Sequence, residues 1–380
     1  MQFYHEHLEK QLGRAQFLML LLLINIIQAE KKVRLETIAR VFPLWITCEG
    51  RRRKLQRFLD LPSLTISSLL WPIISYWLDS SVPKKSKLKL YLAIDRSQWK
   101  NINLLMVSVI WSRRAIPLAW RLLPHLGNCN QEEQESVLSP ILERLKEYEI
   151  VVLGDREFCS LDLAAWLQAR NVGFCLRLKK ATCLEVENQI WQRLDDLPIK
   201  PGVALYYQGK RIRKTAPVSG FSVAAKWKRN YRNQTTKEPW YILTNQGSLT
   251  VAIQAYKRRM GIEEMFRDCK SGGYNLEGTG LRGSRLSSII LVMSLAYLKS
   301  TLQGDEINKH QGQKYVCRPK EAGRIYRRRS TFGVGLDGEN WVKNLEQYHH
   351  LTAELTSKSP HKRRFYLRGI RAQTIICSAS

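Results

Sequence analysis

The chain of 380 residues is long enough for two or three domains around a sizeable core. It carries 61 Lys and Arg against 33 Asp and Glu, a formal net charge of +28, which indicates a polyanionic partner: nucleic acid or an acidic membrane surface. The eight cysteines form no Cys-x-x-Cys pair and none has a His at zinc-finger spacing, so zinc modules are excluded and we expect reduced thiols in a cytosolic protein.

The amino-terminal part, residues 1–86, lacks the alternation of strands and is expected to be helical. Its apolar run Phe17–Ile24, extended to Ile27, is too short to span a membrane, and no small-residue cleavage site follows it. We therefore expect a buried helix there, not a membrane segment or a signal peptide.

A basic amphipathic helix is predicted at residues 51–59. Leu55, Phe58 and Leu59 share one face at spacing i, i+3 and i+4, and cations surround that face. Such a helix can enter a DNA groove, whereas the alternative is a helix that only coats the surface with Arg. On the first interpretation, the side chains that contact DNA are Arg51, Arg52, Arg53, Lys54 and Arg57.

Two carboxylates are expected at the ends of buried strands. Residues 87–95 alternate polar and apolar, then become apolar and end on Asp95, and residues 149–154 read as a short buried strand followed by Asp155. A carboxylate in that position needs an ion to solvate it, although a single Asp also serves as a helix cap or turn former. The elements between and after them complete the order βββαβαβ, with strands at 104–111, 115–120, 150–154 and 173–179 and helices at 131–148 and 160–170.

Residues 180–247 carry short alternating pieces at 203–207, 222–227 and 240–244, so we expect a small β-rich insertion subdomain. The last piece begins with Trp240. A helix-like run from Ser248 to Lys270 follows, and we expect it to belong to the same domain as the βββαβαβ elements.

Four residues of that run share one helical face, because their offsets of 0, 3, 7 and 14 fall within an arc of roughly 60°. They are Tyr256, Arg259, Glu263 and Lys270. Taken alone, this is also the pattern of a surface face with an Arg–Glu pair. Together with Asp95 and Asp155, however, Glu263 completes a carboxylate set that suits Mg²⁺, with Mn²⁺ as a substitute.

The spacing Tyr-x2-Arg-x3-Glu-x6-Lys resembles the YREK signature of the DDE transposases of bacterial insertion sequences, the IS-four family. Asp95-Arg-Ser-Gln-Trp99 and Gly154-Asp-Arg-Glu-Phe158 resemble the first two acid motifs of that family, and residues 262–279 resemble its third block. The resemblance runs from about Arg51 to Ser300. One position departs from it: Met260 stands where an aromatic is usual, and the helix-weakening Gly261 follows.

The resemblance implies an α/β fold: an RNase H-like mixed sheet flanked by helices, whose first and fourth strands lie side by side. It implies a helical DNA-binding domain (1–86), a catalytic domain (87–179 and 248–300), the β-rich insertion (180–247) and a basic carboxyl-terminal region (301–380). In that last region we expect one helix near residues 339–355. Three alternatives remain for the region: helical dimerisation, DNA contact and partial disorder.

The resemblance also implies the roles of the candidate residues. Asp95, Asp155 and Glu263 would hold two metal ions, with Asp95 bridging, while Tyr256, Arg259 and Lys270 grip DNA phosphates and Trp240 stacks on a flipped base. The implied partners are double-stranded DNA, as terminal inverted repeats and as target, and a second copy of the chain. No membrane and no small-molecule substrate is expected. The alternatives are a metal-dependent nuclease on the same fold and an inactive, transposase-derived DNA-binding protein.

Overall fold

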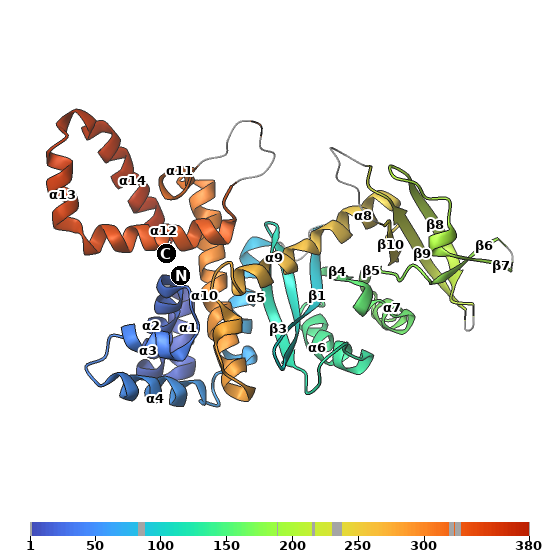
Figure 1. Ribbon diagram of the computed structural model, residues 1–380, viewed down its shortest axis with the longest axis horizontal. Helices are drawn as coiled ribbons and strands as arrows, with labels where there is room; N and C mark the ends of the chain where they lie inside the picture. Colours follow the sequence, from blue (N-terminus) through green and yellow to red (C-terminus); the bar gives the residue numbers. More distant parts are fainter. Residues whose placement is uncertain are drawn as a thin grey trace. The chain divides into compact units, whose positions relative to one another are not determined.

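The computed structural model describes residues 2–82, 88–187, 189–214, 217–229, 238–318, 323 and 328–379. The chain divides into two compact units, one made of residues 1–73 and 268–380 and the other of residues 74–267. We describe each unit by itself, with the elements labelled in Figure 1. The division into domains inferred from the sequence stays a prediction beside these two units.

Residues 74–267 are built on a mixed sheet of ten described strands in the order β3-β2-β1-β4-β5-β10-β9-β8-β6-β7. The strands are β1 (Lys89–Trp99), β2 (Ile102–Trp111), β3 (Arg114–Leu122), β4 (Glu149–Gly154), β5 (Gly173–Arg177), β6 (Cys183–Glu187), β7 (Ile190–Arg193), β8 (Ala204–Ile212), β9 (Val218–Lys226) and β10 (Trp240–Thr244).

The first five strands have the RNase H-like arrangement that was predicted. β2 pairs antiparallel with both β1 and β3, while β4 runs parallel to β1 and to β5. Parallel strands are covered on both faces and therefore need continuous apolar runs. β4 meets this requirement, because Ile150, Val151, Val152 and Leu153 are all buried. Helices α6 (Gln131–Arg144) and α7 (Leu161–Gln168) pack on β2, β3 and β5 and touch each other.

The structure corrects several details of the predicted sheet. β1 does not end at Asp95 but continues, paired with β2, to Trp99. The strands of the expected insertion continue the same sheet, because β10 pairs antiparallel with β5 and β9 pairs with β10. The hairpin β6–β7 was not expected; its strands are short and half exposed, so their alternation is weak.

The other unit is helical. It contains α1 (Gln2–Leu12), α2 (Arg14–Glu30), α3 (Leu35–Val41), α4 (Cys48–Leu59), a π-helical turn at Ile66–Leu70, and later α10 (Gly283–Lys309), α11 (Gln313–Val316), α12 (Thr331–Gln347), α13 (His349–Ser357) and α14 (Arg363–Ala379). A further helix, α5 (Trp71–Ser81), begins in this unit and ends in the other. The predicted buried helix is confirmed as α2, where Phe17, Leu20, Leu23 and Ile27 are almost inaccessible.

The long helix α10 forms the core of this unit and packs against α2, α12 and α14. Gly304 on α10 and Gly335 on α12 face the backbone of the opposite helix so closely that a Cβ at either position would collide with a carbonyl oxygen. Among the described residues, α10 is the one helix long and apolar enough to cross a membrane, but most of its side chains are buried against these neighbours.

Two helical predictions need correction. The single helix expected near residues 339–355 is two helices, α12 and α13, which meet at Tyr348, and α14 adds a third that the sequence pattern did not indicate. The run Ser248–Lys270 is likewise two helices, α8 (Leu249–Arg258) and α9 (Met260–Cys269). The junction between α8 and α9 falls on Arg259.

Candidate active site

Strand register places the two predicted aspartates beside each other. β1 and β4 are parallel, and their last paired residues are Ile94 and Gly154. Asp95 and Asp155 follow these partners directly, so both carboxylates lie just beyond the end of the β1–β4 ladder. The prediction that the first and fourth strands are neighbours is therefore confirmed.

The α8–α9 junction brings the third carboxylate to the same place. Ser248 caps the start of α8 by accepting a hydrogen bond from the amide of Val251. Gly261, at the start of α9, lies so close to the Arg114 carbonyl that a Cβ there would stand 2.9 Å from the carbonyl oxygen. The helix-weakening glycine noted in the sequence therefore lets α9 approach β3 closely.

The three carboxylates converge on one guanidinium. Arg259 Nη1 lies 3.4 Å from Oδ2 of Asp95, and Nη2 lies 3.9 Å from Oδ2 of Asp155. Nη2 also donates to Oε1 of Glu263 in a close ion pair. Arg259 is only 5% exposed, and its Nε is buried with no hydrogen-bond partner among the described residues. The three carboxylates thus share one cationic partner, Arg259, and their predicted role as metal ligands stays a prediction.

Burial and repulsion between the carboxylates shift the pKa values in this cluster. Burial is the largest cause that raises the pKa of Asp95 to about 6; Arg259 and the Arg96 amide oppose the rise, and Glu263 and Asp155 add to it. Burial acts to lower the pKa of Arg259, but Tyr256 and the three carboxylates outweigh it and raise that pKa. The site therefore favours a positive charge between its acids.

Tyr256 and Trp240 lie next to the acids. The Tyr256 hydroxyl donates to Oδ1 of Asp155 at 3.2 Å, and burial raises the pKa of this phenol. Trp240, half-buried at the start of β10, meets the Tyr256 ring edge-on with 5.2 Å between centroids. Lys228 Nζ lies 4.8 Å from the centroid of the Trp240 ring. The aromatic pair therefore connects β10 with Asp155.

A second cation beside Asp155 was not predicted. Arg177, the last residue of β5, places Nη1 3.7 Å from Oδ1 of Asp155 and pairs with Glu238 through Nη2 at 3.0 Å. The signal was available in the sequence, because the carboxyl ends of neighbouring parallel strands meet at the same edge of a sheet.

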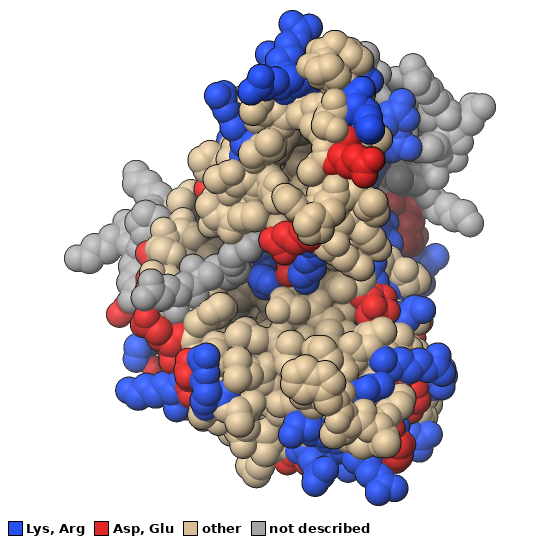
Figure 2. Space-filling model, turned by 90° about the vertical axis from the view of Figure 1, so that its left-hand side faces the viewer, with Lys and Arg blue, Asp and Glu red and all other residues tan. Residues whose placement is uncertain are grey.

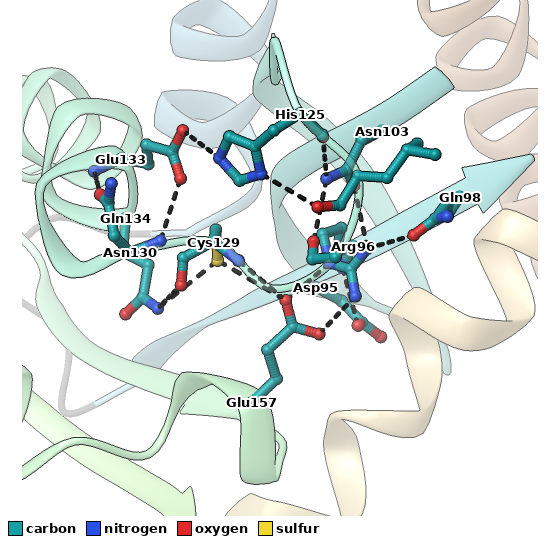
Figure 3. A network of polar contacts seen from close by, with 12 residues as sticks. Asp95, Arg96, Gln98, Asn103, His125, Cys129, Asn130, Glu133, Gln134 and Glu157 are labelled. Carbon is teal, nitrogen blue, oxygen red and sulfur yellow. Dashed lines mark hydrogen bonds and ion pairs between the residues drawn. The ribbon is translucent and has the colours of Figure 1, made fainter. Parts of the chain in front are cut away.

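A buried ion pair links the residues that follow the two aspartates (Figure 3). Arg96 comes directly after Asp95, and Glu157 comes two residues after Asp155. The guanidinium binds the carboxylate in a bidentate manner, Nε to Oε1 at 2.6 Å and Nη2 to Oε2 at 3.0 Å. Because both side chains are largely buried, the pair fixes β1 next to Asp95 relative to the turn after β4.

Further polar contacts hold this Arg96–Glu157 pair in place. Arg96 Nη1 also donates to Gln98 and Asn103, and Asn103 donates to the carbonyls of His125 and Gly127. His125 pairs with Glu133, which forms the capping box of α6 with Asn130. Sequence reasoning missed Arg96 and Glu157 although both lie inside the two acid motifs, because a motif shows which residues are present and not which of them pair.

Lys270 follows the last residue of α9 and belongs to the helical unit. Its Nζ lies 2.7 Å from Oε1 of Glu277, a residue of the motif block around positions 276–279. Its predicted role on DNA phosphates stays a prediction.

The predicted basic helix is α4, and Leu55, Phe58 and Leu59 form its buried face as expected. Arg52 and Arg53 both pair with Glu49, and their hydrogen bonds lower the pKa of that carboxyl to about 2. The guanidinium of Arg51 binds backbone carbonyls instead. Lys54 and Arg57 are both exposed. On the face drawn in Figure 2, Lys and Arg side chains lie in several separate groups with a few acidic side chains among them.

A divalent metal ion is the cofactor that the donor set implies. Three carboxylates suit a hard cation by their chemistry, and their convergence on a buried guanidinium shows that the site accommodates positive charge. Among the described residues, no three His, Cys, Asp or Glu side chains are arranged to hold an ion together. The residues fit the ion by donor type, whereas in this structure the Arg259 guanidinium lies between them.

Comparison with known proteins adds a family match. Residues 125–298 match the family described as "Transposase DDE domain", a range that includes Asp155, Trp240 and the α8–α9 residues but begins after Asp95. No curated protein matches the chain. A structure titled "Cryo-EM structure of piggyBac transposase synaptic complex with hairpin DNA" aligns over 86% of this chain and 71% of its own, with 12% identity and a TM-score of 0.41. Residues 125–298, somewhat less than half of the chain, are thus similar to a transposase DDE domain.

Proposed function

We propose that this protein is a DNA transposase of the bacterial IS-four type, which moves an insertion sequence by a cut-and-paste reaction with a DNA hairpin intermediate. The observation that carries the proposal is the meeting of Asp95, Asp155 and Glu263 around one guanidinium just beyond the end of the β1–β4 ladder. The match to a transposase DDE domain and the YREK spacing support it.

Asp95, Asp155 and Glu263 would hold Mg²⁺, with Mn²⁺ as a substitute. Bound there, such ions stabilise the charge of phosphodiester transition states and activate an oxygen nucleophile. Asp95 is the most buried of the three carboxylates and follows the end of the β1–β4 ladder directly. This position suits a carboxylate that both metal ions would share. Asp155 and Glu263 are more exposed, which suits ligands that also face the DNA.

Arg259 would serve two partners in turn. Without DNA it offsets part of the negative charge of the three acids, and its planar guanidinium is also suited to bidentate contact with a phosphate. We propose that a backbone phosphate of the bound DNA takes over Arg259, so that the carboxylates become free for metal ions. DNA binding and metal binding would then strengthen each other, as linked equilibria must.

DNA binding would use several separate surfaces. The cations of α4 suit the terminal inverted repeats, and the charge of +28 suits a long polyanionic duplex. A pair of protein copies would hold two element ends, and the helical region 301–380 is our candidate for dimerisation or further DNA contact. Lys270 would add a point charge on a phosphate.

Trp240 is the residue for which we expect a step-specific effect. If it stacks on a flipped base, Trp240→Ala should spare the first nick and slow hairpin formation, since stacking is worth on the order of 1–3 kcal/mol and acts on distorted DNA. The side chain is only half-buried, so the melting temperature should change little. Nick and hairpin rates on a denaturing gel, measured beside a melting curve, check this. Parallel loss of both steps with a large drop in melting temperature would make Trp240 a core residue.

Glu157 is the residue for which we expect a positioning effect. Glu157→Gln keeps the shape but weakens the bidentate pair with Arg96, so the two aspartates should hold metal less well. We expect Mn²⁺ affinity, measured by calorimetry in the presence of DNA, to fall about tenfold, the lower end of the range for residues that orient metal ligands. Asp195→Asn breaks the exposed bidentate pair with Arg193 and serves as the matched control. Equal Mn²⁺ affinity in both variants would remove the positioning role.

The proposal is tested by incubating the purified chain with Mg²⁺ and a labelled duplex that contains the DNA flanking its reading frame. We expect nicks at one defined position, and then hairpin ends, only when the divalent ion is present. Cleavage scattered over unrelated DNA would favour the metal-dependent nuclease. Salt-dependent binding without any cleavage would favour the inactive, transposase-derived DNA-binding protein.

A further inference from the structure

The loop between α3 and α4, residues 42–47, presents an unusual side chain to solvent. Trp45 is 103% exposed, so it touches essentially nothing in this structure. Val41 and Ile46, near it in the chain, are about half exposed, and we call these three exposed side chains the apolar patch. An indole left in water forgoes the gain of burial, on the order of 2 kcal/mol, and a patch of this kind usually marks an interaction site.

The loop that carries Trp45 is held by one arginine from α4. Arg51 donates through Nε to the Ala39 carbonyl at 2.6 Å and through Nη1 to the carbonyls of Leu44 and Ile46, at 3.3 and 3.0 Å. Nη2 donates to the Arg40 carbonyl at 3.4 Å. The carbonyls on both sides of Trp45 are thus fixed, and Arg51 has few donors left for DNA.

Both ends of the loop are anchored as well. Phe42 is buried at one end, and Thr47 at the other caps α4 by accepting a hydrogen bond from the Gly50 amide at 3.1 Å. The loop is therefore ordered before any partner arrives, and binding through Trp45 would cost little conformational entropy.

Charge identifies the partner. Residues 40–57 contain six cations and a single acid, Glu49. The apolar patch is limited to three side chains, far less than the roughly 800 Å² that each protein contributes to a standard interface. A single aromatic side chain among cations suits DNA, because proteins insert apolar side chains at base steps while Lys and Arg hold the adjacent phosphates.

We propose that Trp45 contacts the bases of the bound DNA, and that α4 holds the phosphates next to that contact. The proposal rests on the proposed function, because it takes DNA as the partner. It assigns different tasks to neighbouring residues: Trp45 reaches the bases, Arg51 orders the loop, and Arg52 and Arg53 contact phosphates.

The test is binding of a labelled duplex from the DNA flanking the reading frame, measured by fluorescence anisotropy over a range of salt. Trp45→Ala should weaken binding about tenfold to a hundredfold, as expected when one aromatic side chain no longer stacks on a base. It removes no charge, so the slope of log affinity against log salt should stay unchanged. The melting temperature should also stay unchanged, because the side chain packs against nothing.

Three further variants separate the tasks. Arg52→Gln combined with Arg53→Gln should weaken binding and reduce the salt slope by about one unit for each phosphate that the protein no longer neutralises. Trp45→Phe should restore part of the affinity that Trp45→Ala lacks. Trp166→Ala removes a partly exposed indole from α7 of the other unit, which has no proposed role on DNA, and should bind as the wild type does.

Two results would overturn the proposal while the proposed function stands. One is wild-type affinity of Trp45→Ala in a protein that binds and cleaves its end DNA. The other is a change of oligomeric state in Trp45→Ala without DNA, which would make the patch a contact between copies of the chain. If the wild type binds no DNA at all, the proposed function fails, and the Trp45 contact fails with it.

Discussion

Asp95→Asn, Asp155→Asn and Glu263→Gln are each expected to abolish strand cleavage, with a reduction of at least about a thousandfold, while binding to the end DNA changes little. The physical reason is that metal ligation depends on the carboxylates, whereas DNA affinity depends on cations, most of which lie outside this site. Cleavage with Mg²⁺ and binding by anisotropy, measured on the same preparations, check the two halves of this prediction. Substantial Mg²⁺-dependent cleavage by any one variant would remove that residue from the site.

The stability of Asp95→Asn should differ from that of the wild type in a pH-dependent way. Because the folded-state pKa of Asp95 is raised to about 6 from its ordinary 3.8, ionised Asp95 costs stability above pH 6, and this cost is relieved as the pH falls through 6 toward 4. Without divalent ions, Asp95→Asn should therefore be more stable than the wild type at pH 8, by on the order of 2–3 kcal/mol, and equally stable near pH 4. Melting curves at the two pH values check this. A lower stability at pH 8 would mean that the pairing with Arg259 outweighs the cost of burial.

Arg259→Gln is expected to have the second large effect, because it removes the cation that the three carboxylates share and leaves only Arg177, beside Asp155. Removing one partner from a buried ion pair costs on the order of 3 kcal/mol, so the metal-free protein should melt at a clearly lower temperature at pH 8. Mn²⁺ should then bind more tightly to the variant than to the DNA-free wild type, and should raise its melting temperature more. Cleavage should be abolished, since no guanidinium remains to hold the phosphate.

Lys257→Gln provides the control for Arg259→Gln, because Lys257 is an exposed cation two residues away on α8. It should leave the melting temperature and the Mn²⁺ affinity as they are in the wild type. If Arg259→Gln binds Mn²⁺ no more tightly than this control, then Arg259 does not compete with metal ions, and the exchange of partners proposed for it is wrong.

The fold of the catalytic part could be predicted because its signals are local. Apolar strands β1, β4 and β5, separated by amphipathic helices, define parallel pairing, and this pairing places Asp95 beside Asp155. The end of β1 could not be predicted, because residues 96–99 are mostly polar and only their pairing with β2 makes them a strand.

The arrangement of the site was only partly visible in the sequence. Helical spacing put Arg259 and Glu263 on one face, but spacing within one helix cannot show that the guanidinium lies among acids from two strands. The same holds for Arg51, which a count of charges assigns to DNA and which the structure shows bonded to loop carbonyls. In both cases the missing information is an interaction between separate segments, which composition and periodicity do not carry.

Joining, as distinct from cutting, tests the central claim most directly, because it separates a transposase from a nuclease with the same carboxylates. The measurement is a reaction of the wild-type chain with Mg²⁺, a labelled duplex ending in the cleaved element end, and an unlabelled circular plasmid. We predict label covalently attached to the plasmid through the 3′-hydroxyl of the element end, dependent on Mg²⁺ and absent with Asp155→Asn. Cut ends that are never joined to the plasmid, under conditions in which cleavage goes to completion, would contradict the account.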